Sequence, residues 1–90
     1  MVELNHSIVS FNSDTLIKGD HGVLVAVFVT KKGTGSNKVQ FRNGTTASAT
    51  PIECTIFTAI EGNYQNIHRR FENGIFAKCT GSAEITVIFK

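Results

Sequence analysis

Hydrophobic and polar residues alternate along most of this chain, or gather in short apolar blocks. Thr, Val, Ile and Phe fill these blocks, whereas Gly, Asn, Ser and Thr fill the gaps between them. Apolar residues do not recur at the spacing of an amphipathic helix, so the pattern predicts strands throughout. The predicted strands are His6–Phe11, Thr15–Lys18, Gly22–Thr30, Lys38–Asn43, Pro51–Thr58, Gln65–Phe71, Gly74–Thr80 and Glu84–Phe89.

This arrangement predicts one all-β domain over residues 1–90. Seven or eight short strands separated by turn residues are typical of a compact antiparallel sandwich or barrel. A jelly roll is one topology that the pattern allows, but strand order stays open. A domain this small buries a modest fraction of its surface, and such domains often gain stability by self-association.

The apolar positions also indicate how successive strands would pair, because a one-residue slip inverts every side chain. We expect three hairpins. The first has a loop at 81–83, and the second has a loop at 72–74, with Gly74 where a positive φ is needed. The third joins Gly22–Thr30 to Lys38–Asn43. Arg69 then falls on the apolar side and must reach solvent at a strand edge or pair with a carboxylate. The inward residues of the last two strands would be Ile75, Ala77, Cys79, Ile85, Val87 and Phe89.

The strand that begins at Gly22 is apolar on both faces. Strict alternation places Val23, Val25, Val27 and Val29 on one face and Leu24, Ala26 and Phe28 on the other. Each strand of a two-sheet sandwich shows only one face to the core, so the second apolar face requires a cover. The predicted protein interface is Leu24, Phe28, Phe57, Phe76 and Ile88.

Charge and targeting signals add little to this picture. The formal net charge of +2 is too small to indicate nucleic acid or a membrane as the partner. We see no signal peptide and no apolar run of the roughly 18 residues that a membrane helix needs. The sequons at Asn5 and Asn43 are therefore interpreted as chance. Cys54 and Cys79 are expected to be free thiols, with one inter-strand disulfide as the alternative.

The residues that carry chemistry do not form a recognisable catalytic, metal-binding or cofactor-binding motif. His6, His21, His68 and the two cysteines lack the spacing of metal ligands, so we expect no metal and no cofactor. No nucleophile stands beside a base, and we expect no enzyme activity. Single-stranded nucleic acid or a carbohydrate remains an alternative ligand. The candidates for these roles are Lys38, Arg42, Tyr64, His68, Arg69, Arg70 and Phe71.

Three segments carry a resemblance to a known group of proteins. They are "GVLVAVFV", "NKVQFRNGTTAS" and "RRFENGIFAKCTGSAEITVIFK", which together cover roughly residues 20–90. The pattern resembles that of small virion proteins of tailed bacteriophages, in which an F-E-N-G-I/L corner leads into a T-G-S/T-A-x-x-T-V terminal hairpin. The matching positions here are 71–75 and 80–87. The cysteines and Phe57 are not part of the resemblance.

The resemblance implies a capsid decoration or cement protein that self-associates and binds the major capsid protein within the virion, after assembly in the host cytoplasm. An adaptor at the head–tail junction or in the tail is the alternative within that group. Both agree with the sequence-based expectation of a non-enzymatic module whose apolar strand faces bury against a neighbouring copy or a shell protein.

Overall fold

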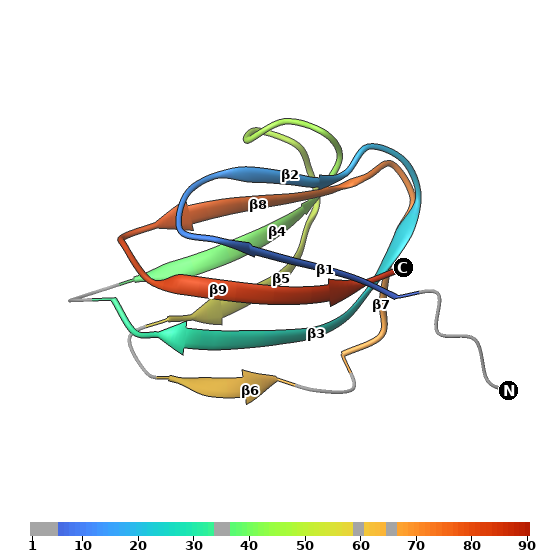
Figure 1. Cartoon of the computed structure of the whole chain (residues 1–90). Helices are drawn as coiled ribbons and strands as arrows, with labels where there is room; N and C mark the ends of the chain where they lie inside the picture. Colours follow the sequence, from blue (N-terminus) through green and yellow to red (C-terminus); the bar gives the residue numbers. More distant parts are fainter. Residues whose placement is uncertain (1–5, 34–36, 59–60, 65–66) are drawn as a thin grey trace, which may run out of the picture.

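The computed structural model describes residues 6–33, 37–58, 61–64 and 67–90, which form nine strands and no helix. No helix in this part of the chain is long and apolar enough to cross a membrane. The strands are β1 (Ser7–Phe11), β2 (Thr15–Lys18), β3 (Gly22–Lys31), β4 (Lys38–Asn43), β5 (Ile52–Phe57), β6 (Gly62–Tyr64), β7 (Arg69–Phe71), β8 (Ile75–Thr80) and β9 (Glu84–Phe89) (Figure 1).

Most strand boundaries agree with the predicted ranges to within one residue. The exceptions lie between β5 and β8. β6 was not predicted, and the strand predicted at Gln65–Phe71 is reduced to β7, with Gln65 and Asn66 outside the described residues. Turn-like residues fill β6, which explains why the apolar pattern misses it.

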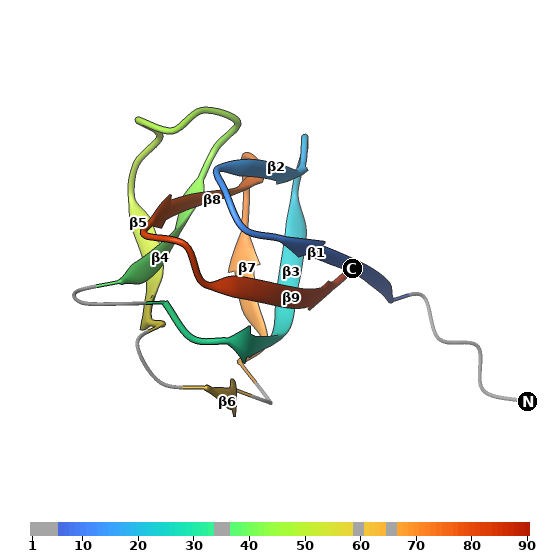
Figure 2. The ribbon, with the colours of Figure 1, turned by 60° about the vertical axis from the view of Figure 1, so that its left-hand side comes forward.

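The strands form two antiparallel sheets packed face to face (Figures 1 and 2). Sheet A has the order β1-β9-β3-β6, and β7 also pairs with β3; sheet B has the order β2-β8-β4-β5. β6 and β7 pair with successive parts of β3 and so act as one interrupted edge strand. This order is that of a jelly roll, and the predicted all-β sandwich is confirmed.

The three predicted hairpins are wrong. β8 and β9, β7 and β8, and β3 and β4 each belong to different sheets, so each short loop crosses the sandwich. The inward faces were nevertheless predicted correctly, since Ile75, Ala77, Ile85 and Val87 are all buried. A chain that crosses between sheets keeps its apolar face toward the shared core, just as a hairpin does. The inward or outward direction of the side chains therefore cannot distinguish a hairpin within one sheet from a crossover between the two sheets.

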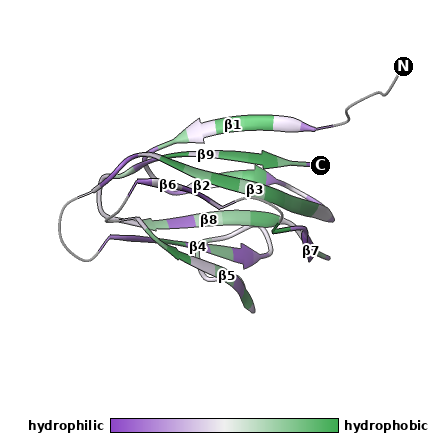
Figure 3. Cartoon of the chain, turned by 90° about the horizontal axis from the view of Figure 1, so that it is seen from below, coloured by the Kyte–Doolittle hydropathy of each residue, from purple (hydrophilic) through white to green (hydrophobic). Residues whose placement is uncertain are grey.

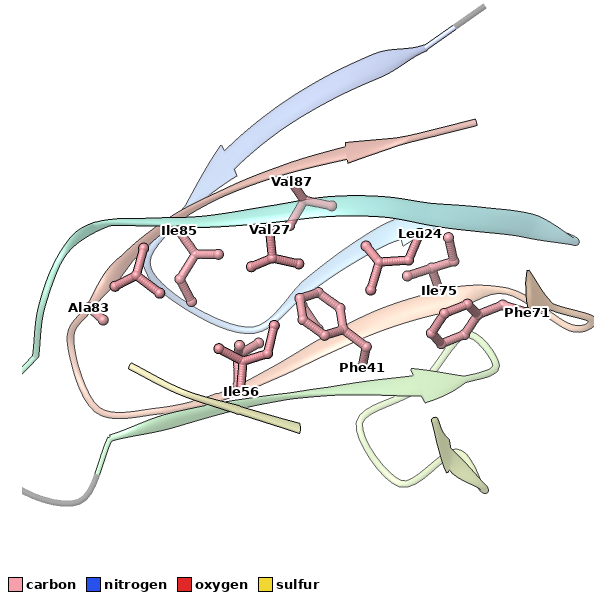
Figure 4. Packing of buried hydrophobic residues seen from close by; sticks show 12 residues of the cluster. Leu24, Val27, Phe41, Ile56, Phe71, Ile75, Ala83, Ile85 and Val87 are labelled. Carbon is pink, nitrogen blue, oxygen red and sulfur yellow. The ribbon is translucent and has the colours of Figure 1, made fainter. Parts of the chain in front are cut away.

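One hydrophobic core lies between the sheets (Figure 4). Leu24, Val27 and Val87 come from sheet A, and Phe41 and Ile75 come from sheet B. Val9, Phe11 and Phe89 pack against this core but are only partly buried. The core is therefore closed by side chains of both sheets, and the inward side chains of β1 lie at its margin.

A bulge in β3 changes which residues of the Val-rich strand face inward. Leu24 pairs with Phe89 and Ala26 with Ile88, so Val25 is an extra residue in the ladder. The bulge shifts the alternation by one, and Leu24, Val27 and Val29 all face the core. The prediction that Leu24 lies on an outer surface is wrong: its side chain is 0% exposed.

A buried polar group fastens the crossovers at one end of β4. The Asn37 side chain accepts a hydrogen bond from the Ser82 amide at 2.9 Å, and its backbone carbonyl accepts one from Thr58 at 3.0 Å. Gly81, with φ of +104°, lies against the Asn37 side chain, which occupies the space that a Cβ would need. The loops after β3, β5 and β8 are thereby held together.

Candidate assembly surfaces

The remaining predicted interface residues lie on two opposite faces of the molecule. Phe28 and Ile88 belong to sheet A, whereas Phe57 and Phe76 belong to sheet B. All four face away from the core, as predicted: Phe57 is 69% exposed and the other three are half-buried. The prediction that these residues form one patch is wrong, because the sandwich separates them.

The outer face of sheet A carries an apolar row that runs to the edge of the sheet. Ile8 of β1 pairs with Ile88 of β9, which pairs with Ala26 of β3. Phe28 lies two residues further along β3 than Ala26, on the same face, opposite Thr86. Ile8 is 69% exposed. We call Ile8, Phe28 and Ile88 the sheet A surface. Sequence reasoning missed Ile8, because only the strand order places it beside Ile88.

The outer face of sheet B carries a second apolar row. Leu16 of β2 pairs with Phe76 of β8, which pairs with Arg42 of β4, which pairs with Ile52 of β5. Leu16 and Ile52 are exposed. We call Leu16, Ile52, Phe57 and Phe76 the sheet B surface. Sequence reasoning missed Leu16 and Ile52, because their short strands do not reveal their cross-strand neighbours.

The Arg42 side chain, which lies within this second row, is held by hydrogen bonds to its own chain. Its Nη1 donates to the Ala49 carbonyl at 3.1 Å and its Nη2 donates to Gln40 Oε1 at 2.9 Å. Its Nε is buried and, among the described residues, has no hydrogen-bond partner. The guanidinium is therefore held by Gln40 of its own strand and by the loop that precedes β5.

A polar network closes the side of the sandwich formed by β5 and β7. Arg69 Nη2 donates to Glu53 Oε1 at 2.8 Å and its Nε donates to the same oxygen at 3.2 Å. Asn43 Nδ2 donates to Glu53 Oε2 at 3.3 Å, and Asn43 Oδ1 accepts from the Asn73 amide at 2.8 Å. We call these four residues the Glu53 network. Of the two alternatives that the sequence left for Arg69, pairing with a carboxylate is the one observed, and this pair bridges the two sheets.

The candidate nucleic-acid residues do not converge on one strip. Lys38 and Arg42 lie on sheet B, whereas Arg69 and Arg70 lie on β7 of sheet A. Phe71, one of the two stacking candidates under the nucleic-acid alternative, is in the core and 1% exposed, so it is not placed to stack on bases.

Cys54 and Cys79 are free and half-buried. They pair with Phe41 and Val39 on opposite sides of β4, which separates them by two strand spacings, roughly 10 Å. This is too far for a disulfide without backbone movement. Burial raises the pKa of Cys54, and burial together with the Asp14 carboxylate raises the pKa of Cys79 to about 11. Both groups are thiols at neutral pH and weak nucleophiles.

The described residues contain no group of three side chains suited to holding a metal ion. A cleft of about 360 Å³ lies where β2, β3, β7 and β9 meet, and Lys18, His21, Arg70 and Lys90 line it. No Asp, Glu or Cys side chain is among the residues that line this cleft.

No family model matches the chain, and no curated protein matches it. Among solved structures, the chain is similar to a Bacillus endospore appendage, described as belonging to a novel family of disulfide-linked pili. The TM-score is 0.53 and the identity is 14%, over 94% of this chain and 82% of that chain. At this identity the likeness supports the β-sandwich fold alone.

Proposed function

We propose that this protein is a non-enzymatic structural subunit that self-associates into a repeating assembly. The observation that carries the proposal is the presence of exposed apolar side chains on both outer faces of a sandwich whose core is complete without them. Apolar surface that the fold does not use is typical of a partner-binding surface.

Two contact surfaces on opposite faces suit a repeating assembly. A subunit with one self-complementary surface stops at a dimer, whereas a second surface allows the assembly to extend. The sheet A surface and the sheet B surface are separated by the thickness of the sandwich, so one copy can contact two neighbours at once. Repetition then multiplies weak contacts through a high effective concentration. The solved structure that shares this fold is described as a pilus, which is also a repeating assembly.

Sedimentation velocity over micromolar to millimolar concentrations tests this proposal. The wild type should form species larger than a dimer as concentration rises. The double variant Leu16→Lys/Phe57→Lys adds two charges to the sheet B surface at exposed positions, and it should lose those larger species while remaining folded. A wild type that stays monomeric throughout would contradict the proposal.

The narrower role implied by the sequence resemblance, a capsid decoration or cement protein, remains a prediction, as does the adaptor role within a virion. Both need a shell or tail partner besides a second copy. Mixing the protein with intact or empty phage shells and counting bound copies tests them. Stoichiometric binding supports the virion role, whereas an assembly that forms without any binding to shells favours a free-standing structure.

A further inference from the structure

We infer that the free edge of β1 pairs with the same edge of a second copy, joining two A sheets into one continuous antiparallel sheet. This inference rests on the proposed self-association and specifies its geometry. β1 is the terminal strand of sheet A, and its five residues pair with β9 in unbroken register from Ser7–Phe89 to Phe11–Ile85. Among the described residues no strand pairs with its other side, which therefore presents backbone N–H and C=O groups.

β1 lacks the features that protect an exposed edge strand. Soluble proteins place charges, Pro or bulges on such edges to prevent pairing with another chain. The sequence of β1, Ser-Ile-Val-Ser-Phe, contains no charged residue, no Pro and no Gly, and its ladder has no register shift.

The other edges of the sandwich are protected. β2 has only four residues and contains a bulge between Leu16 and Lys18. β5 follows Pro51, contains a register irregularity and carries Glu53, which Arg69 occupies. β6 and β7 have three residues each, and β7 carries Arg69 and Arg70. β1 is thus the edge best suited to accept a strand.

A second copy is the partner that this edge fits. In a two-fold pairing centred on Val9, Ile8 lies opposite Ser10 of the other copy, Ser7 opposite Phe11, and Val9 opposite itself. No like charges meet in this register, whereas two copies of β7 would bring arginines together. A two-fold axis also makes the interface self-complementary, as in most homodimers.

The side chains of β1 benefit from the added strand on both faces. Val9 and Phe11 pack against the core but are only partly buried, because β1 is the terminal strand of its sheet. The sheet A surface on the outer face reaches the edge of the sheet at Ile8, which is 69% exposed. In the dimer this apolar surface would continue across the two-fold axis onto the second copy. Figure 3 shows β1 as the marginal strand of its layer, with apolar residues along its middle.

A charge swap across the axis tests the pairing and its register. Ile8→Lys should weaken the dimer at least about tenfold in Kd. The interface then holds two unpaired lysines, one from each copy, in place of two apolar side chains. Adding Ser10→Glu on the same chain places each new Lys opposite a Glu of the other copy and should restore most of the affinity. Phe57→Lys is the matched control: Phe57 is equally exposed but lies on sheet B, so the β1 dimer should be unaffected.

Sedimentation equilibrium measures these constants, with thermal unfolding as the check on folding. If I8K lowers the melting temperature by more than a few degrees, S10K replaces it, because Ser10 occupies the facing position. A dimer that I8K leaves intact overturns the inference while the proposed self-association stands. Weakening by I8K without rescue by S10E overturns the proposed pairing of β1 with β1 in this register. It is the result expected if β1 pairs with a different strand of the second copy. A wild type that never associates overturns both.

Discussion

The two open sides of the sandwich differ in how they treat their edge strands. On the side of β5 and β7, the Glu53 network ties the two sheets together, and charged side chains line both edges. On the side of β1 and β2, the end strand of sheet A is neutral, unbulged and bordered by an exposed Ile8. The chain thus closes one side itself and leaves a neutral edge strand on the other, where we propose that a second copy pairs.

The largest loss of stability is expected from disrupting the loop between β7 and β8, on the side that the Glu53 network closes. Gly74→Ala should destabilise the protein by about 3 kcal/mol or more, because Gly74 has a φ of +136° and a Cβ there would lie 2.7 Å from the Gly44 carbonyl oxygen. Chemical denaturation measures the loss. Gly62→Ala is the control: nothing lies within 4 Å of its added Cβ, and it should cost less than about 1 kcal/mol.

Removing the centre of the polar network should have the next largest effect. Asn43→Ala leaves the Asn73 amide without its acceptor and Glu53 Oε2 without this donor, at a cost of about 2 kcal/mol in unfolding free energy. Asn12→Ala makes the same change at an exposed position next to β1 and should be neutral within about 0.5 kcal/mol. Equal losses in the two variants would contradict the difference between the sides.

The ion pair that bridges the sheets should contribute less. Arg69→Ala is expected to cost about 1 kcal/mol, because Arg69 is more than half exposed while Glu53 is mostly buried. Arg70→Ala is the matched control, since its contact with Glu72 spans 3.9 Å between two exposed side chains and should contribute almost nothing. Denaturation of both variants in the same buffer, at low and high salt, measures the difference.

The smallest effect on stability is expected on the side of β1 and β2, where Asp14 makes the stability depend on pH. Hydrogen bonding from the Cys79 amide at 2.8 Å, with Lys78 adding to it, lowers the pKa of Asp14 below its ordinary value of 3.8. A lowered pKa stabilises the fold above pH 3.8, and this contribution is lost as the pH falls through the folded-state pKa. Asp14→Asn should therefore reduce the loss of stability below about pH 4. Denaturation curves from pH 2 to 6 that superimpose after normalisation to pH 6 would contradict this role.

The comparison also marks what the sequence could predict. Alternation along each strand was enough to predict most strand boundaries and the inward positions of Ile75 and Val87, because burial acts residue by residue. It could not predict strand order, because a hairpin and a crossover impose the same facing. The single extra residue Val25 reversed the phase of β3, and this moved Leu24 from the predicted surface into the core.

The candidate site was predicted only in part for the same reason. Phe28, Phe57, Phe76 and Ile88 were predicted to face outward from local alternation, and they do. Their separation onto two faces, and the position of Ile8 at a free edge, depend on which strands are neighbours. That information comes from long-range pairing, which the pattern within one strand does not carry.

Amide hydrogen exchange at low and high protein concentration tests the central claim most directly. If β1 pairs with a second copy, its amides that point away from β9 become more protected as concentration rises, whereas the edge amides of β5 and β7 do not change. Protection in β1 that is independent of concentration, in a sample that has associated, would contradict the account.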